Sequence, residues 1–393
     1  MKLLWVKADF LHPPNRGGQI RTLEMLKRLH SRHEIHYVAL HNGNPDGVAL
    51  SHEYCSHSYP IEHHIAEKRS IAFAGQLLKG LVSPLPVAVS RYRSDRMKRE
   101  IEKLLRHQKF DCMVCDFLFP SPNIPDLGAC VLFQHNVEAT IWRRHASNAP
   151  TPAHRFYFNL QARRMLAYES HACRSAKSVI AVSSVDADLM RKEYGVQRVS
   201  TVSTGVDIGY FAPPASVPAV TDLAFVGSMD WKPNIDGAAW FVREILPLIR
   251  RRRPHCTLTL VGRKPTPELA RLAQSDPRIQ LTGTVPDIRP HLWGAAVSIV
   301  PLRIASGTRL KIFESMAARV PVVSTSIGAE GLPVENATHL HIADTPLAFA
   351  DRCLELIESR EARQCIAEAG WDLVSSRFSW DAVSKEFEGL LAC

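Results

Sequence analysis

A glycine loop followed by basic residues is the strongest chemical signal in this chain of 393 residues. Residues 300–325 are predicted to form a strand, a loop, a helix and a second strand, and the loop and helix start contain Ser306, Gly307, Thr308, Arg309, Leu310 and Lys311. Positive side chains at a helix N-terminus oppose the helix dipole, so Arg309 and Lys311 are costly there unless an anion neutralises them. The amides near the helix start point to the same place, which favours a bound diphosphate. Glu314 follows one to two turns later and is a candidate acceptor for ribose hydroxyls. The alternative is a helix start that only contacts solvent.

A second polar cluster, Gln134 to Glu138, follows the apolar run Val131–Phe133. In open α/β sheets, ligands bind at the carboxyl ends of the strands. His135 and Glu138 are therefore candidate catalytic residues that could reach a bound sugar or an acceptor hydroxyl. The alternative is a polar loop whose side chains cap the next helix.

A glycine pair, Gly17 and Gly18, lies between the first apolar run and the first helical pattern. Glycines allow the backbone to come close to a ligand, and a helix N-terminus offers free N–H groups to an anion. The spacing is not G-x-G-x-x-G, so the dinucleotide-binding fingerprint is absent. A tight turn alone would also explain the pair.

The nine cysteines are scattered and odd in number, unlike a disulfide framework. Cys112 and Cys115 match C-x-x-C, but they lie in an apolar run, and no second cysteine pair stands at zinc spacing. We expect buried thiols on a strand and no metal site, with metal or redox chemistry as the alternative. The apolar run Leu3–Val6 is too short for a signal peptide, and no stretch approaches the roughly 18 apolar residues of a membrane span. This predicts a cytoplasmic protein.

Short apolar runs alternate with helical patterns along the whole chain. The predicted strands are 3–6, 35–40, 112–117, 131–133 and 178–182 in the first half and 223–226, 257–261, 279–281, 297–302, 320–323 and 340–342 in the second. Several runs are almost continuously apolar, which is typical of parallel strands with helices on both faces. Helical spacing is clear in 20–29 and 240–249. The pattern predicts an α/β protein with doubly wound parallel sheets.

The chain is too long for one such sheet, so two domains are expected. The proline-rich stretch 212–220 is a natural linker, and the break should fall within 204–220. The strand 223–226 then begins the second series.

The composition is that of a soluble globular protein, with 46% apolar residues and 22% charged residues. This excludes a disordered or collagen-like chain. The net charge of +9 fits anionic small molecules, an anionic membrane or nucleic acid without choosing among them. Residues 68–106 combine basic residues with apolar clusters, and either pack at a domain edge or contact an anionic membrane or a lipid-linked substrate.

Several segments, taken in order, resemble family 4 glycosyltransferases (glycosyl transferases group 1), which have the GT-B fold. The resemblance covers nearly the whole chain and is strongest over 223–332. The matching pieces are 225–237, 260–262, 281–285, 307–314 and 328–331, with Gly17, Gly18, Arg21, 182–183, 205–207 and Phe211 in the first half.

The resemblance implies two Rossmann-like domains that face a cleft. Residues 1–205 would form the acceptor-side domain, 206–374 the domain that binds the nucleotide sugar, and 375–393 would pack back on the first domain. It also implies that Gly17, Gly18, Gly227, Ser228, Lys232 and the 306–314 segment contact the donor. Family members often carry two glutamates with seven residues between them; Glu314 matches the second, and Ser306 stands at the first. Many members also place an Arg and a Lys after Gly227, where this chain has Ser228 and Pro233.

The expected function is sugar transfer from a nucleotide-diphosphate sugar to a glycan, lipid-linked or small-molecule acceptor, with retention at the anomeric carbon. The nucleotide sugar is a co-substrate, and neither a metal nor another cofactor is required. One alternative is an inactive relative that binds a nucleotide or glycan as a partner subunit, which the Ser306 and Ser228 departures suggest. Another is a nucleotide-sugar epimerase. Nucleic-acid binding is not expected, because the chain has no recognised module or aromatic-rich basic face.

Overall fold

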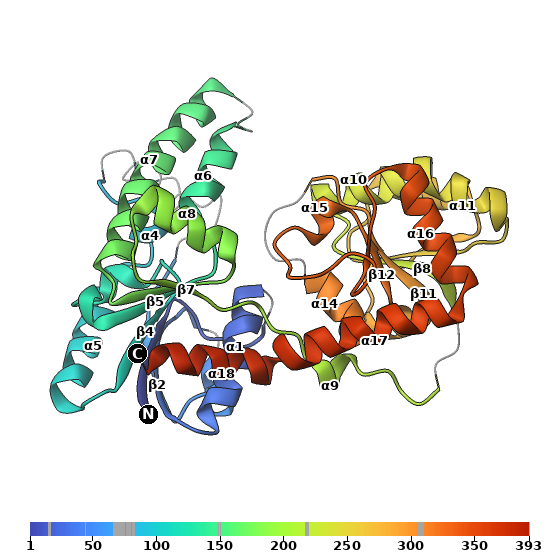
Figure 1. The fold of residues 1–393 in the computed structure, drawn as a ribbon. Helices are drawn as coiled ribbons and strands as arrows, with labels where there is room; N and C mark the ends of the chain where they lie inside the picture. Colours follow the sequence, from blue (N-terminus) through green and yellow to red (C-terminus); the bar gives the residue numbers. More distant parts are fainter. Residues whose placement is uncertain are drawn as a thin grey trace. The chain divides into compact units, whose positions relative to one another are not determined.

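The computed structural model describes residues 1–14, 17–43, 45–65, 75, 80, 83–147, 149, 151–216, 220–304 and 310–392. The chain divides into two compact units (Figure 1). Unit 1 comprises Met1–Ser203 and Val383–Cys393, and unit 2 comprises Thr204–Ala382. Each unit is built on one parallel sheet covered by helices.

Within the described residues, the sheet of unit 1 has seven strands in the order β3-β2-β1-β4-β5-β6-β7, all paired in parallel. They are β1 (Lys2–Lys7), β2 (Glu34–His41), β3 (His57–Glu62), β4 (Cys112–Asp116), β5 (Cys130–Gln134), β6 (Ser178–Ala181) and β7 (Val199–Thr201). The five apolar runs of the first half all form strands, as predicted. The two edge strands, β3 and β7, were not predicted.

Helices connect these strands. They are α1 (Gly17–His30), α2 (Pro45–Ala49), α4 (Val87–Ser90), α5 (Asp95–His107), α6 (Glu138–Ser147), α7 (Pro152–Ser175) and α8 (Ser184–Tyr194), with short 3₁₀ turns at Leu50–Glu53, Ser121–Asn123 and Leu127–Ala129. Helix α7 begins where Thr151 accepts a hydrogen bond from the His154 amide and Pro152 occupies the first turn, two common helix-start features. The antiparallel pair α6 and α7 extends beyond the sheet (Figure 1).

Unit 2 has six described strands in the order β10-β9-β8-β11-β12-β13, again all parallel. They are β8 (Thr221–Val226), β9 (Leu258–Val261), β10 (Ile279–Leu281), β11 (Ala295–Val300), β12 (Val322–Ser324) and β13 (His341–Ile342). The helices are α9 (Ile208–Phe211), α10 (Lys232–Trp240), a π-helical turn (Phe241–Ile245), α11 (Leu246–Arg252), α12 (Pro267–Gln274), α13 (Arg289–Trp293), α14 (Leu310–Ala317), α15 (Ser326–Ala329), α16 (Pro346–Glu358) and α17 (Arg360–Arg377). Every apolar run predicted in the second half forms a strand. The strand, helix and second strand predicted over 300–325 are β11, α14 and β12, and residues 305–309 of the predicted loop lie outside the described residues.

Both sheets are doubly wound, as the sequence predicts. In unit 1 the chain builds outward from β1 to β3 and then returns to place β4 on the other side of β1. In unit 2 the same reversal occurs between β8 and β11. Ligands of open α/β sheets bind at such reversals, beyond the carboxyl ends of the strands.

The residues of the C-terminal helix α18 (Trp380–Leu391) are divided between the two units, and an aromatic side chain packs each part within its own unit. In unit 1, the Phe387 ring lies 5.7 Å from Trp5 and 4.9 Å from Phe133, centroid to centroid. In unit 2, Trp380 packs over Gly205, where an added Cβ would lie 2.5 Å from the indole ring. The part of α18 that belongs to unit 1 begins at Val383.

Three sequence expectations concern surface and thiol chemistry. Cys112 and Cys115 are buried strand thiols, as predicted, and burial raises the pKa of Cys112 to about 11. No helix of the described residues is both long and apolar enough to cross a bilayer. The apolar start of the 68–106 segment falls largely outside the described residues, which resume at Ser83.

Candidate active site

Asp116 lies at the strand reversal of unit 1, at the carboxyl end of β4, and is completely buried. Lys7, which ends β1, donates to Asp116 Oδ1 over 2.9 Å. Trp5 Nε1 and Thr22 Oγ1 donate to Oδ2 over 2.9 and 2.7 Å. Burial alone would raise the pKa of Asp116, but Lys7 and His135 outweigh it and hold that pKa well below its ordinary range. The carboxylate is therefore charged and fully engaged at neutral pH.

His135, a predicted catalytic residue, is buried beside this carboxylate, with Nε2 2.7 Å from Asp116 Oδ1. Burial lowers the pKa of His135 to about 4, against the opposing pull of Asp116. The ring is therefore neutral at pH 7, and the contact with Asp116 places its proton on Nε2. Nδ1 is then an acceptor. Neither ring nitrogen makes a hydrogen bond of good geometry among the described residues, and Nε2 has its close electrostatic contact with Asp116.

The predicted glycine pair lies close to Nδ1 of His135. A Cβ added to Gly18 would lie 3.3 Å from His135 Nδ1, so the glycine leaves the ring its space. Gly17 begins α1 and has open space around it. The structure therefore brings Gly18 and His135 together, although His135 lies 117 positions after Gly18 in the sequence.

Glu138 opens helix α6 and is buried, but its neighbour is another carboxylate. Glu169 accepts hydrogen bonds from the amides of Glu138 and Ala139 over 2.9 and 2.8 Å, and from Tyr194 Oη over 2.8 Å. Burial and the charge of Glu169 raise the pKa of Glu138 to about 7. The capping residue of α6 is thus Glu169, which the sequence analysis missed because it comes from α7, far along the chain.

Removing the Glu138 charge should change the pH dependence of stability. The pKa of Glu138 is about 7 in the folded protein and about 4.5 in the unfolded chain. As the pH rises between these two values, the unfolded chain loses the Glu138 proton first, so the parent protein becomes less stable. We expect Glu138→Gln to gain stability relative to the parent on going from pH 5 to pH 8, by up to about 3 kcal/mol. Urea unfolding at both pH values measures this, with the exposed Glu62→Gln as the matched control. A difference that does not grow with pH would contradict the assignment.

In unit 2, Lys311 and Gly227 meet at the strand reversal. Gly227 directly follows β8, and Lys311 lies in the first turn of α14. Lys311 Nζ donates to Asn234 Oδ1 over 2.7 Å and lies 4.6 Å from the centre of the Phe225 ring. A Cβ on Gly227 would lie 2.8 Å from Lys311 Nζ and 2.6 Å from Asn234 Nδ2. The ammonium group therefore lies close to the backbone of the strand end.

Two further residues of this cluster were missed by the sequence analysis. Asn234, on α10, is buried and donates to the Ser228 carbonyl over 2.9 Å while it orients Lys311. Arg263 Nε donates to Ser228 Oγ over 2.8 Å. Arg263 comes from the loop after β9, the neighbouring strand, so a positive charge is present near Ser228 even though no cation directly follows Gly227 in sequence. The sequence did contain a signal for Arg263, because this cation directly follows Gly262 at the end of a predicted strand.

Gly262 makes the closest backbone approach at this edge. A Cβ there would lie 1.8 Å from the Gly227 carbonyl oxygen, so one of the two strand ends would have to move. We expect Gly262→Ala to destabilise unit 2 by about 3 kcal/mol and to weaken nucleotide binding. Thermal unfolding with and without nucleotide measures both effects. Gly209→Ala, which meets only an ordinary contact, is the control, and an equal loss in both variants would show that the close approach is unimportant.

The remaining predicted donor residues divide into two groups. Ser306, Gly307, Thr308 and Arg309 lie outside the described residues. Leu310 begins α14, and Glu314 follows on the same helix, half-buried. Burial raises the pKa of Glu314, and Lys311 acts against this rise.

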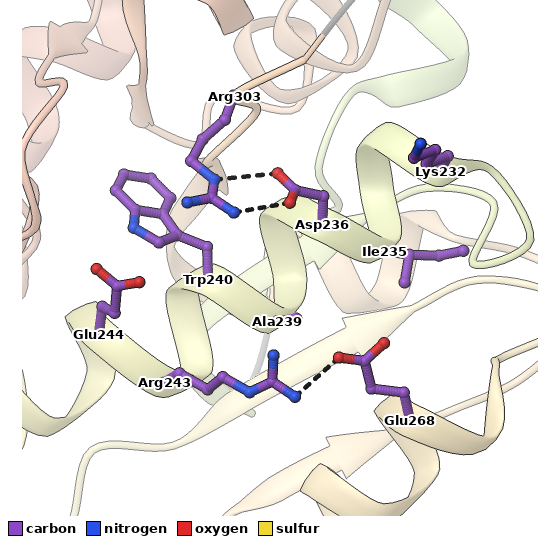
Figure 2. Close-up of a pocket in the computed structure, with 9 residues that line it drawn as sticks. All are labelled: Lys232, Ile235, Asp236, Ala239, Trp240, Arg243, Glu244, Glu268 and Arg303. Atoms are coloured by element: carbon purple, nitrogen blue, oxygen red, sulfur yellow. Dashed lines mark hydrogen bonds and ion pairs between the residues drawn. The ribbon is translucent and has the colours of Figure 1, made fainter. Parts of the chain in front are cut away.

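Lys232 lines a cavity of about 350 Å³ together with residues of α10 and α12 (Figure 2). Arg303 forms a bidentate salt bridge with Asp236, in which Nε and Nη2 donate to the carboxylate oxygens over 3.0 and 2.7 Å. Arg243 Nη2 donates to Glu268 Oε1 over 2.8 Å. The lining holds three cations and three acids, namely Lys232, Arg243, Arg303, Asp236, Glu244 and Glu268. With its charges balanced, this cavity does not favour a diphosphate, whereas the Lys311 cluster does.

Comparison with known proteins gives matches along most of the chain. The family profile described as Glycosyltransferase Family 4 matches residues 15–210, and the one described as Glycosyl transferases group 1 matches residues 221–359. A relative among curated proteins, an uncharacterized 44.6 kDa protein in the cps region of Klebsiella pneumoniae, is 19% identical over 403 residues, with 96% of each chain covered.

Solved structures share the fold at low identity. Anabaena HepE in complex with UDP and glucose has a TM-score of 0.64 and 14% identity, with 100% of this chain and 99% of that chain covered. Sucrose-phosphate synthase of Thermosynechococcus elongatus has a TM-score of 0.70 and 14% identity, covering 99% and 98%. WaaG, a glycosyltransferase involved in lipopolysaccharide biosynthesis, has a TM-score of 0.63 and 12% identity, covering 99% of each chain.

Proposed function

The chain belongs to the group 1 glycosyltransferases of family 4 and has their GT-B fold, and from this premise we propose that it transfers a sugar from a nucleotide-diphosphate sugar to a glycan, lipid-linked or small-molecule acceptor. The observation that carries the donor assignment is the Lys311 ammonium held by Asn234 over Gly227, at the strand reversal of unit 2. This place suits a diphosphate for three reasons: it has a cation, the start of α14 lies there, and Gly227 has no side chain that would obstruct a ligand.

The donor to test first is a UDP-sugar. Anabaena HepE was solved with UDP, with UDP and glucose, and with UDP-glucose, and it shares this fold over its whole length. We propose that Lys311, Arg263 and Arg309 supply the positive charge that the leaving diphosphate needs, so that no metal is required. Fixed cations stabilise a developing anion most effectively when they are held in place before the reaction.

We propose retention at the anomeric carbon. The front-face reaction of the family uses no protein nucleophile, and in unit 1 the buried Asp116 is already engaged by Lys7, Trp5, Thr22 and His135. His135, neutral and with Nδ1 free to accept, is proposed to take a hydrogen bond from a hydroxyl of the sugar or acceptor. Glu138, with a pKa of about 7, is retained as a second candidate for proton transfer.

His135→Ala is expected to lower kcat by about 10²-fold, the low end for a positioned polar group, while nucleotide affinity changes little. Asparagine can place a polar atom near the position of Nδ1, so His135→Asn should recover part of the lost rate. Steady-state kinetics with the accepted donor, together with nucleotide binding by calorimetry, separates the two effects. Equal kcat in the parent and His135→Ala would remove His135 from the site.

A donor screen tests the main proposal. A ligand that binds only the folded protein raises its unfolding temperature, so UDP-, GDP- and ADP-sugars are compared by thermal shift and then assayed for transfer. We expect one nucleotide to stabilise the protein and its sugar to be transferred with retention, as read from the anomeric configuration of the product. Stabilisation without turnover on any acceptor would support the inactive-partner alternative, and isomerisation without acceptor would support an epimerase.

We further propose that the acceptor is presented at an anionic membrane surface and that the α6–α7 hairpin contacts it. Residues 139–168 contain five arginines and neither aspartate nor glutamate. Near the hairpin tip Phe156 is 70% exposed, and Arg155 beside it is exposed as well. Basic and aromatic side chains on a projecting helix pair suit an anionic lipid interface. One relative belongs to a cps region, and WaaG acts in lipopolysaccharide biosynthesis, which supports a lipid-linked acceptor.

Vesicle sedimentation tests the membrane proposal. The parent should bind vesicles that contain phosphatidylglycerol, and bind less to phosphatidylcholine alone or at high salt. Arg155→Glu should weaken binding by about 10–30-fold, given about 1 kcal/mol for each charge near the surface. Arg251→Glu, the same charge change on an exposed residue of α11 in unit 2, is the control. Equal binding of parent and Arg155→Glu would rule out this surface.

A further inference from the structure

We propose that Glu34, His36 and His57 form a binding site for a divalent transition-metal ion, with zinc the best match, on unit 1. One ligand atom of each residue lies within 4.8 Å of the others. The cluster lies at the amino ends of β2 and β3, whereas the predicted catalytic residues lie at the carboxyl ends of the strands. The site is therefore independent of the sugar-transfer chemistry.

Strand register places the three residues on one face of the sheet. His36 is the direct partner of His57 in the parallel pair β2·β3, and the two imidazole rings lie 4.5 Å apart, centroid to centroid. Glu34 lies two residues before His36 on the same strand, so its side chain points to the same face. Because all three positions are fixed by backbone pairing, the cluster does not depend on a loop.

The distances suit a small tetrahedral ion. Glu34 Oε1 lies 2.9 Å from His36 Nε2 and 3.6 Å from His57 Nε2. Zinc bonds to imidazole and carboxylate of about 2.0–2.1 Å imply ligand atoms about 3.3 Å apart in a tetrahedron. The two measured distances lie on either side of that value, so small rotations of the exposed side chains are sufficient to form the site.

His36 is already oriented as a metal ligand. Its side chain is 2% exposed, and Nδ1 lies 2.9 Å from the Tyr59 hydroxyl. A hydrogen bond donated by the second ring nitrogen is the usual device that fixes a metal-binding imidazole, and here the Tyr59 hydroxyl oxygen can accept it. Glu34 and His57 are 45% and 54% exposed, which leaves a path from solvent and room for water as the fourth ligand. Two imidazoles and one carboxylate favour zinc, and disfavour magnesium or calcium, which prefer oxygen ligands alone.

Lys2 is the competitor for this site. Its ammonium group lies 3.2 Å from Glu34 Oε1, the same oxygen that both imidazoles approach. A bound dication would replace the ammonium group, and Lys2 already lies within 5.8 Å of the centre of the Phe110 ring, where it can remain. Lys2→Met should therefore tighten metal binding, whereas removal of any ligand should weaken it. Since β3 is an edge strand, a bound ion would tie it to β2.

Metal titration of the untagged full chain tests the site. Zinc affinity is measured by competition with a chromophoric chelator, and cobalt substitution should give the visible absorption of a tetrahedral site. We expect one ion per chain. His57→Ala and Glu34→Gln should each weaken binding at least tenfold, Tyr59→Phe should weaken it about tenfold, and Lys2→Met should tighten it.

His107→Ala and Cys365→Ser are the controls, because both side chains are exposed and could bind zinc adventitiously. Neither should change the stoichiometry. The proposal is overturned if zinc does not bind at micromolar concentration, or if it binds equally to the parent and to His57→Ala. Circular dichroism of each variant shows whether it is folded, and sugar transfer should not differ between the metal-free and metal-bound protein.

Discussion

Asp116→Ala is expected to destabilise unit 1 by about 3–5 kcal/mol, the largest single-residue effect on stability that we predict. The carboxylate is completely buried and neutralises Lys7, whose side chain is 5% exposed. Removing one partner of a buried ion pair leaves the other charge without compensation, which costs about this much. The indole of Trp5 and the hydroxyl of Thr22 would lose an acceptor as well. Chemical denaturation measured on unit 1 probes gives the value.

Two variants make the result specific. Asp188→Ala removes an exposed carboxylate that pairs with Arg191 at 2.7 Å, and we expect a loss below about 1 kcal/mol because exposed pairs contribute little. The double variant Lys7→Met/Asp116→Leu removes both charges of this pair and should recover part of the loss, since apolar replacement of a buried pair is often neutral, while the buried Arg21 keeps its charge. If Asp116→Ala is no worse than Asp188→Ala, the cluster does not hold the strand ends together.

The buried Asp116 and His135 also determine how the stability of unit 1 depends on pH in the acid range. The pKa of Asp116 and the pKa of His135 are both lower in the folded protein than in the unfolded chain. Between about pH 6.5 and 4 the unfolded chain protonates His135 while the folded protein does not, so stability falls as the pH falls through this window. Glu138 acts in the opposite direction over part of this range, so the acid sensitivity should be steeper in Glu138→Gln.

In unit 1, sequence periodicity identified the five central strands and missed the two edge strands, β3 and β7, whereas in unit 2 it also identified the edge strands β10 and β13. The central strands read as apolar runs because helices cover both faces. β3 contains His57, Ser58 and Pro60, and a proline is tolerated there because the strand lies at the edge of the sheet. β7 reads Val-Ser-Thr and has a single apolar residue, whereas the equally short edge strands β10 and β13 of unit 2 lie in apolar runs that were recognised. Edge strands that are rich in polar residues therefore carry little of the signal on which such a prediction depends.

The candidate site was only partly readable from the sequence, for a related reason. Lys311 could be identified because its cost at a helix start is a local property. Its partner Asn234 and the second cation Arg263 arrive from other strand–helix units, and their contribution depends on tertiary packing. Likewise, Asp116 gave no local signal at the end of an apolar run, although it is the residue that positions His135. A residue whose role depends on a tertiary contact with a distant part of the chain gives no recognisable spacing pattern in the sequence.

Replacing both Arg309 and Lys311 with alanine is expected to lower kcat/KM by about 10²–10⁴-fold, the largest effect on catalysis that we predict. Each charge-assisted hydrogen bond contributes roughly 1.5–3 kcal/mol, which corresponds to about 10–100-fold for each cation. Arg309 lies outside the described residues, so its share of this effect is predicted from the sequence alone. Negative charge grows on the diphosphate as the sugar leaves, so the loss should be greater in kcat than in donor binding.

Lys311→Ala alone should lower kcat/KM by about 10–100-fold, and Asn234→Ala should reproduce part of this loss. Asn234 fixes the ammonium group 2.7 Å from its Oδ1, over the Gly227 backbone, so without it the charge is still present but no longer held in place. Arg251→Ala, which removes an exposed charge from the end of α11, is the control and should leave kcat/KM unchanged. If Arg309→Ala/Lys311→Ala binds nucleoside diphosphate as tightly as the parent, these cations do not hold the donor. If Asn234→Ala retains full activity while Lys311→Ala does not, the charge is needed but its fixed position is not.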